Sequence, residues 1–256
     1  MGVSCDTIGG LSGEWTLPQF GTGSGPVPGA VFFSPLQRSV AVQHFLDALK
    51  AADVPAAARL LDAHPELLSG RNAQGASWLA TSIYYGQPAI TRLFLDRGVQ
   101  PDPFEAAMLG QLPRVQAFVE QEGGSPDAFA PDGFPLLGLA VFFGQKEVFR
   151  YLLDRGAHPG LAAKNPARVT PLHAAAARGD LVSAQALLER GADASARQQS
   201  DYTALHTAAQ NGRRDLAELL VAHGADRTAR SADGLTPAEQ AAKAGHTELA
   251  AYLAPA

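Results

Sequence analysis

Apolar residues recur along the chain in short helical stripes bounded by glycines. Between Gly144 and Gly156 the stripe is Val148, Leu152 and Leu153, which repeat with the spacing of one helix face. The pattern predicts a series of short amphipathic helices, each ended by a turn. Further stripes of the same kind are formed by Phe45, Leu46, Leu49, Leu60 and Leu61, by Leu187 and Leu188, by Leu219 and Leu220, and more weakly by Leu249 and Leu253.

Three four-residue motifs that begin with threonine, called the threonine words below, mark helix starts at a fixed interval. They read Thr-Pro-Leu-His at 170–173, Thr-Ala-Leu-His at 203–206 and Thr-Pro-Ala-Glu at 236–239, and both 203 − 170 and 236 − 203 equal 33. Threonine suits an N-cap, and proline is tolerated at the first helical position. A glycine nine residues after each threonine ends the helix in a tight turn. Each word therefore predicts the first helix of a two-helix unit.

The period and its words resemble the ankyrin repeat. A period of 33 residues that carries T-P-L-H-x-A matches that family's pattern, and the Gly-Ala-Asp endings at 191–193 and 224–226 agree with it. The resemblance implies an all-α solenoid of helix-turn-helix units that are joined by short β-hairpin fingers. We expect seven units, with turn positions at Asp53, Gly86, Gly110, Gly144, Gly179, Gly212 and Gly245.

Two spacings depart from the regular period. The turn positions at 86 and 110 are only 24 residues apart, and residues 99–103 are too few for a finger, so we expect a missing finger there. The stretch from Gly156 to Thr170 is two residues longer than the family spacing and contains Pro159 and Pro166. A longer and looser finger is expected in that place.

The predicted domain organisation is an arm at 1–40 and an ankyrin-repeat domain at 41–256. Glycine and proline punctuate the arm, which shows no pattern of a stable element. Three interpretations stay open: the arm is flexible and docks through its aromatic residues, it folds back over the repeats and shields them, or it is upstream sequence included by a wrong start. The aromatic residues are Trp15, Phe20, Phe32 and Phe33.

Composition narrows the classes of partner and location. A net charge of −5 argues against a nucleic-acid backbone as the main partner, because that affinity comes from clustered cations. Cys5 is the only cysteine, so a disulfide framework is not expected. The sequence shows no secretory signal and no apolar run long enough to span a membrane. We therefore expect a cytoplasmic monomer, and the excess of arginine over lysine is typical of a bacterial source.

Candidate chemistry is sparse in this sequence. His173 and His206 lie one unit apart, about 8–10 Å in a helix stack, which is too far for two ligands of one zinc ion. They are interpreted as structural histidines that hydrogen-bond neighbouring backbone or hydroxyl groups. The glycine-rich run at 21–25 lacks the strand, helix and lysine of a phosphate-binding loop. We predict no enzymatic activity, no catalytic residue, no metal and no cofactor.

Two positions of each first helix are predicted to face away from the core. With the threonine position counted as zero and 100° per residue, offsets two, five, six and nine gather on the core side, and seven and eight point elsewhere. The family resemblance implies that these two positions vary and contact the partner on the concave face. The predicted partner-binding residues are Tyr84, Tyr85, Met108, Leu109, Phe142, Phe143, Arg178, Gln210 and Asn211.

The first six of these residues are large and apolar, and the last three are polar. An apolar patch of a few hundred Å² usually binds something, and Tyr and Phe suit binding hot spots. The competing interpretation is that the paired aromatics pack against the adjacent unit and lengthen the core. We predict a protein–protein interaction module that binds a protein or peptide on its concave face. The alternative is a regulatory or protective subunit permanently attached to an enzyme.

Overall fold

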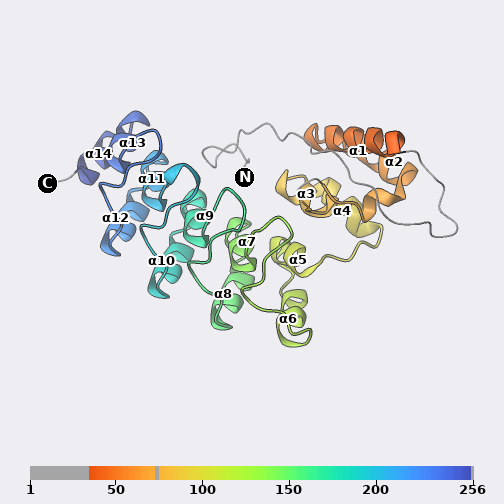
Figure 1. Ribbon diagram of the computed structural model, residues 1–256, viewed down its shortest axis with the longest axis horizontal. Coiled ribbons are helices and arrows are strands. Elements are labelled where there is room, and N and C mark those ends of the chain that lie inside the picture. Colours follow the sequence, from red (N-terminus) through yellow and green to blue (C-terminus); the bar gives the residue numbers. More distant parts are fainter. Residues whose placement is uncertain (1–34, 73–74, 255–256) are drawn as a thin grey trace. The chain divides into compact units, whose positions relative to one another are not determined.

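The computed structural model describes residues 35–72 and 75–254, with side chains from residue 40 onward. Within these residues the α-helices occur in consecutive pairs (Figure 1). They are α1 (Pro35–Lys50), α2 (Val54–Ala63), α3 (Trp78–Tyr84), α4 (Pro88–Asp96), α5 (Pro103–Leu109), α6 (Leu112–Glu120), α7 (Leu136–Phe142), α8 (Lys146–Asp154), α9 (Pro171–Arg178), α10 (Leu181–Glu189), α11 (Ala204–Gln210), α12 (Arg214–Ala222), α13 (Pro237–Lys243) and α14 (Thr247–Leu253).

The helix pairs confirm the predicted fold class and the number of units. Seven pairs follow one another, and no β-sheet is present in the described part of the chain. The fingers are turns rather than β-hairpins, with isolated bridges at Arg71 with Ser77 and Phe129 with Pro135. Two short 3₁₀ segments, η2 (Pro65–Leu68) and η3 (Gln199–Asp201), complete the regular structure.

Side chains that begin the first helices satisfy helix N–H groups, as the threonine words predict. The side chains of Thr170, Thr203 and Thr236 each accept a hydrogen bond from the main-chain N–H three residues later. In the other direction, a side chain at that third position accepts a hydrogen bond from the N–H of the threonine. Such reciprocal capping fixes where each helix begins, because two otherwise unpaired donors are satisfied together.

Turns between the two helices of a unit are left-handed, as expected, with one correction. Six glycines at the predicted turn positions have positive φ, from 63° at Gly86 to 86° at Gly245. In the first unit the prediction at Asp53 is wrong by one residue, because Ala52 has the positive φ of 55°. Asp53 instead caps α2, where its carboxylate accepts a hydrogen bond from the N–H of Ala56 at 2.9 Å.

Each finger is closed by one main-chain hydrogen bond. The N–H groups of residues 72, 130, 198 and 231 donate to the carbonyl four residues later. In the long finger Ala163 donates instead to Val169, six residues later, which confirms the predicted insertion of two residues. The long finger is also tied to the preceding one, since Lys164 N–H donates to the carbonyl of Gly133 at 2.8 Å.

The helix pairs of the described residues are grouped into two larger compact units, which meet in sequence at Pro101 and Asp102. We call them the N-terminal unit and the C-terminal unit. Helix α4 ends at Asp96 and α5 begins at Pro103, so the predicted missing finger is confirmed at this boundary. The N-terminal unit comprises α1 to α4. Its core is aromatic: the ring of Phe45 meets Trp78 and Phe94 edge-on, at centroid distances of 5.6 and 5.8 Å.

The C-terminal unit comprises α5 to α14. Its first helices α5, α7, α9 and α11 pack side by side in one layer, and the second helices α6, α8, α10 and α12 form another (Figure 1). Buried leucines run through the unit from pair to pair as one continuous core, for example Leu136, Leu152, Leu187, Leu205 and Leu220. Each pair therefore covers the apolar face of its neighbour, which no pair could bury alone.

The arm predicted at 1–40 is described only at its end. Helix α1 begins at Pro35, within the range assigned to the arm. Trp15, Phe20, Phe32 and Phe33 lie outside the described residues. The three interpretations of the arm stay predictions.

Truncation of Phe45 tests the aromatic core of the N-terminal unit. Phe45 is fully buried, so Phe45→Ala should lower the free energy of unfolding by about 3–5 kcal/mol. Val182, which is 70% exposed on α10, provides the control, and Val182→Ala should change it by less than about 0.5 kcal/mol. Urea denaturation followed by circular dichroism measures both. Equal effects of the two variants would contradict this account of the core.

Candidate protein-binding surface

The ends of the first helices carry the predicted contact residues, which we call the recognition positions (offsets seven and eight). In the C-terminal unit the most apolar pair is Phe142 and Phe143, at the end of α7. Their rings meet edge-on at a centroid distance of 5.0 Å and an interplanar angle of 71°. Both side chains are half-buried, and Phe142 packs partly against the core. The pair thus combines a packed base with accessible aromatic surface.

The preceding pair at the end of α5 differs from the prediction. Met108 is only 3% exposed, so almost none of its side chain is accessible to a partner. For this residue the burial favours the packing interpretation over a contact. Leu109 is half-buried and keeps part of its surface accessible. The apolar part of the surface is therefore smaller than the sequence predicts.

Polar side chains occupy the recognition positions of α9 and α11. Arg178, Gln210 and Asn211 are all exposed. The guanidinium of Arg178 donates to the carbonyl of Phe142 at 3.0 Å, which places a cation beside the aromatic pair. The hydroxyl of Tyr202 donates to Oε1 of Gln210 at 3.3 Å, and burial, aided by the charge of Asp233, raises the pKa of Tyr202 to about 12.

Tyr84 and Tyr85 occupy the same positions in the N-terminal unit, at the end of α3. Tyr85 is 40% exposed, whereas Tyr84 is half-buried. Val40 and Val42 on α1 are also exposed, at 49% and 37%. This unit thus has apolar accessible surface of its own.

Within the C-terminal unit, side chains of one helix pair hydrogen-bond carbonyls at the helix end of the preceding pair. We call these hydrogen bonds the braces. Nε2 of Gln145 donates to the carbonyl of Met108 at 2.7 Å, and the Arg213 guanidinium donates to that of Gly179 at 2.8 Å. His246 Nε2 lies 3.1 Å from the carbonyl of Gln210. Sequence reasoning missed these braces, although all three side chains directly follow a turn glycine. They satisfy carbonyls that a helix end leaves unpaired.

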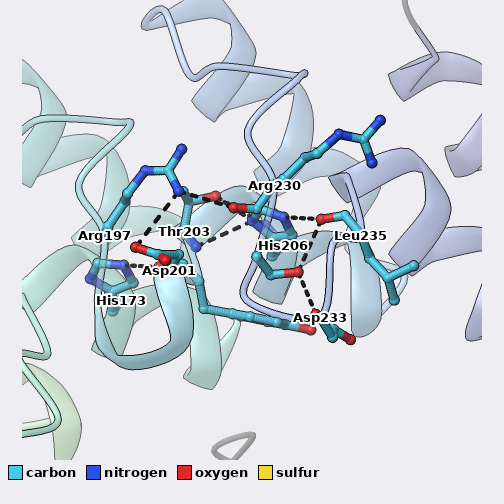
Figure 2. A network of polar contacts seen from close by, with 10 residues as sticks. His173, Arg197, Asp201, Thr203, His206, Arg230, Asp233 and Leu235 are labelled. Atoms are coloured by element: carbon cyan, nitrogen blue, oxygen red, sulfur yellow. Dashed lines mark hydrogen bonds and ion pairs between the residues drawn. The ribbon is translucent and has the colours of Figure 1, made fainter.

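Buried histidines connect the helix starts of one unit to the next finger, as Figure 2 shows for His173 and His206. The main-chain N–H of Thr170 donates to Nδ1 of His173, so this nitrogen is an acceptor and the proton lies on Nε2. The Nε2–H group then donates to the carbonyl of Tyr202 at 3.2 Å. His206 repeats the arrangement with Thr203 and with the carbonyl of Leu235 at 3.0 Å. The interpretation as structural histidines is confirmed.

Metal-binding clusters and grooves are the features of the described residues that bear on candidate chemistry. No group of three or more His, Cys, Asp or Glu side chains in 35–72 and 75–254 is arranged to hold a metal ion. One open groove of about 550 Å³ lies in the N-terminal unit, lined among others by His44, Asp47 and Arg59. Many enzymes close their active site to exclude water, and a groove this open does not exclude it. Among the helices described, none has both the length and the apolar composition needed to cross a bilayer.

Acid should weaken the fold through these histidines. Burial lowers the pKa of His173 to about 4 and also lowers that of His206, so the unfolded chain binds more protons than the folded one below pH 6.5. The free energy of unfolding should therefore fall as the pH drops below 6.5, by up to about 1.4 kcal/mol per pH unit for each histidine, and the contribution of His173 should continue to fall toward pH 4.

Urea denaturation between pH 7 and pH 5 measures this slope. The matched comparison is the double variant His173→Gln/His206→Gln, which should be less stable at pH 7 but should show a flatter pH dependence. An unchanged slope in the double variant would assign the acid sensitivity to other groups.

Comparison with known proteins agrees with this geometry. The family described as ankyrin repeats (3 copies) matches residues 103–198 and 172–256, more than half of the chain. The ankyrin repeat and SAM domain-containing protein 6 of Rattus norvegicus is 42% identical over 60 residues, and that of Mus musculus is 40% identical over 60. These segments span 23% of this chain and 7% of each relative. The repeats indicate a protein–protein interaction module, and the chain belongs to the ankyrin-repeat family.

Proposed function

We propose that the C-terminal unit binds a segment of a partner protein at its recognition positions, without catalysing a reaction. The observation that carries this proposal is the edge-on pair of Phe142 and Phe143 at the end of α7, half-accessible and flanked by Arg178. Aromatic and arginine side chains are enriched among residues that dominate binding energy. In the family the same positions face the concave side of the stack.

Hydrogen bonds from the following helix pairs hold the main chain around this aromatic pair. The carbonyl of Phe142 is held by Arg178 of the next unit, and the carbonyl of Met108, one unit earlier, is held by Gln145. A surface that is already ordered loses little conformational entropy on association. These bonds therefore favour affinity because they hold the helix ends in place.

The recognition positions change from apolar at α5 and α7 to polar at α9 and α11, and this change defines the partner that fits. An apolar or aromatic side chain of the partner suits Phe143 and Leu109, and hydrogen-bonding groups suit Gln210 and Asn211. We therefore propose a segment with an apolar end and a polar end.

Photo-crosslinking tests the proposed surface directly. A benzophenone amino acid placed at position 143 should capture a specific protein from the native cell, whereas the same group at the exposed Val182 of α10 should not. Phe143→Asp should then weaken binding of the captured protein at least tenfold, since it removes an aromatic contact worth more than about 1.4 kcal/mol. Circular dichroism must show an unchanged fold. Capture of the same protein from both positions, or full binding by Phe143→Asp, would contradict the proposal.

A permanent complex with an enzyme is the competing function. It differs from the proposed one in lifetime, since an obligate partner would stay attached during purification. The mass of the native protein by size-exclusion chromatography with light scattering separates the two. A stable complex of larger mass that also loses its partner in Phe143→Asp would favour the permanent subunit.

A further inference from the structure

The fingers share a left-handed residue two positions before the residue that caps the next first helix. At this position Gly75, Gly133 and Gly234 have φ of 84°, 87° and 79°. Arg168 and Asp201 occupy it in the two fingers between, with φ of 50° and 56°. Five fingers thus use one turn conformation, and two of them build it without glycine.

Left-handed backbone is costly for residues that carry a Cβ atom. Glycine adopts it freely, whereas other residues are strained there, and such strained residues cluster at functional sites. In the Asp201 finger the neighbouring Ser200 is left-handed as well, with φ of 61°. The strain is therefore concentrated in two consecutive fingers, where charged side chains take the place of the glycine of the other three.

The fold itself makes little use of these two charges. Arg168 is exposed, and among the described residues its guanidinium has no carboxylate partner within ion-pair distance. The carboxylate of Asp201 lies 3.8 Å from Arg197 and its side chain is 62% exposed (Figure 2). An ion pair of that kind is worth little at a surface.

Main-chain bonds, rather than these side chains, hold the fingers together. The N–H of Gln199 donates to the carbonyl of Ala167 at 2.9 Å, and that of Ala232 donates to the carbonyl of Ser200 at 2.8 Å. Glycine at 168 and 201 would keep both bonds. The charged side chains are thus available for a contact outside the chain.

We propose that Arg168 and Asp201 form a polar recognition site that reads one acidic and one basic residue of a partner segment. This inference rests on the proposed function and extends its surface to the fingertips. A guanidinium binds a carboxylate through two parallel hydrogen bonds, and a carboxylate accepts from lysine or arginine. Because the two charges are opposite, they also fix the direction in which the segment lies.

The spacing of the units predicts the spacing of that motif. Neighbouring helices of a stack lie about 8–10 Å apart, and a segment in the polyproline II conformation advances about 3.1 Å per residue with three residues per turn, so that residues three positions apart share one face. An acidic residue and a basic residue three positions apart therefore match the two fingertips. The partner motif is Asp or Glu, two further residues, and Lys or Arg.

Selection of peptides by the full chain tests the motif. The probe is a displayed library of random twelve-residue peptides, followed by fluorescence anisotropy with labelled synthetic copies of the enriched sequences. Enriched peptides should contain the acidic and basic residues at this spacing. Arg168→Gln should weaken their binding about tenfold, as expected for a lost charge-assisted hydrogen bond. Arg150→Gln, on the exposed face of α8, is the matched control and should leave binding unchanged.

Glycine variants separate recognition from strain. Arg168→Gly should raise the melting temperature by about 2–4 °C while it weakens peptide binding, because it relieves the left-handed strain and removes the charge. Arg168→Gln keeps the strain and should leave the melting temperature within about 1 °C. Asp201→Asn provides the same separation at the second fingertip.

The outcomes distinguish this inference from the proposed function. If enriched peptides lose binding in Phe143→Asp but not in Arg168→Gln, the fingertip site is overturned and the aromatic surface stands. If no peptide is enriched, both are contradicted. A rise in melting temperature in Arg168→Gly with full peptide binding would show that the strained arginine serves no recognition.

Discussion

The C-terminal unit depends on a hydrogen bond that leaves one repeat and enters the next. His173 and His206 each use one ring nitrogen to cap their own helix and the other to hold the carbonyl that precedes the next helix. That carbonyl lies at the base of a finger, so the bond fixes helix, finger and neighbouring unit together. The network continues to Ser231 and Asp233, whose side chains close the following finger (Figure 2). Burial keeps both imidazoles neutral, and only a neutral imidazole can accept a hydrogen bond at one ring nitrogen and donate one from the other.

Leucine packing and polar braces have different tasks in this unit. The continuous core of leucine, alanine and other apolar side chains buries apolar surface, but such contacts are non-directional and alone tolerate sliding between helices. Directional bonds such as those from Gln145 and Arg213 fix the register of one helix end against the next. The recognition positions lie directly at these ends. Their geometry is therefore a consequence of how the repeats are joined, and their chemistry is free to vary.

Much of the fold follows from short-range patterns in the sequence. The threonine words and turn glycines predict the helix pairs, because capping and left-handed turns are local properties. The missing finger and the two-residue insertion follow from the number of residues between successive helix pairs. Burial at a helix end is different, since Met108 is covered by packing that helical periodicity does not describe. The sequence pattern places the first turn at Asp53, one residue after the left-handed Ala52, because no glycine marks it.

The conformation of the fingertip residues is also beyond what the sequence pattern predicts. Arg168 and Asp201 adopt a glycine-like conformation that only comparison of the fingers in three dimensions reveals. The braces likewise depend on which carbonyl a side chain reaches across the unit boundary. Long-range geometry thus decides where the candidate contacts lie, whereas local sequence decides where helices begin and end.

Preordered recognition positions are the central claim of this account, and amide hydrogen exchange of the free, full chain tests it most directly. The amides of α7, α9 and α11 should exchange at least about a thousandfold more slowly than those of an unstructured peptide, without any partner present. Exchange of these helices near the unstructured rate would show that a partner must order the surface, and it would contradict the account.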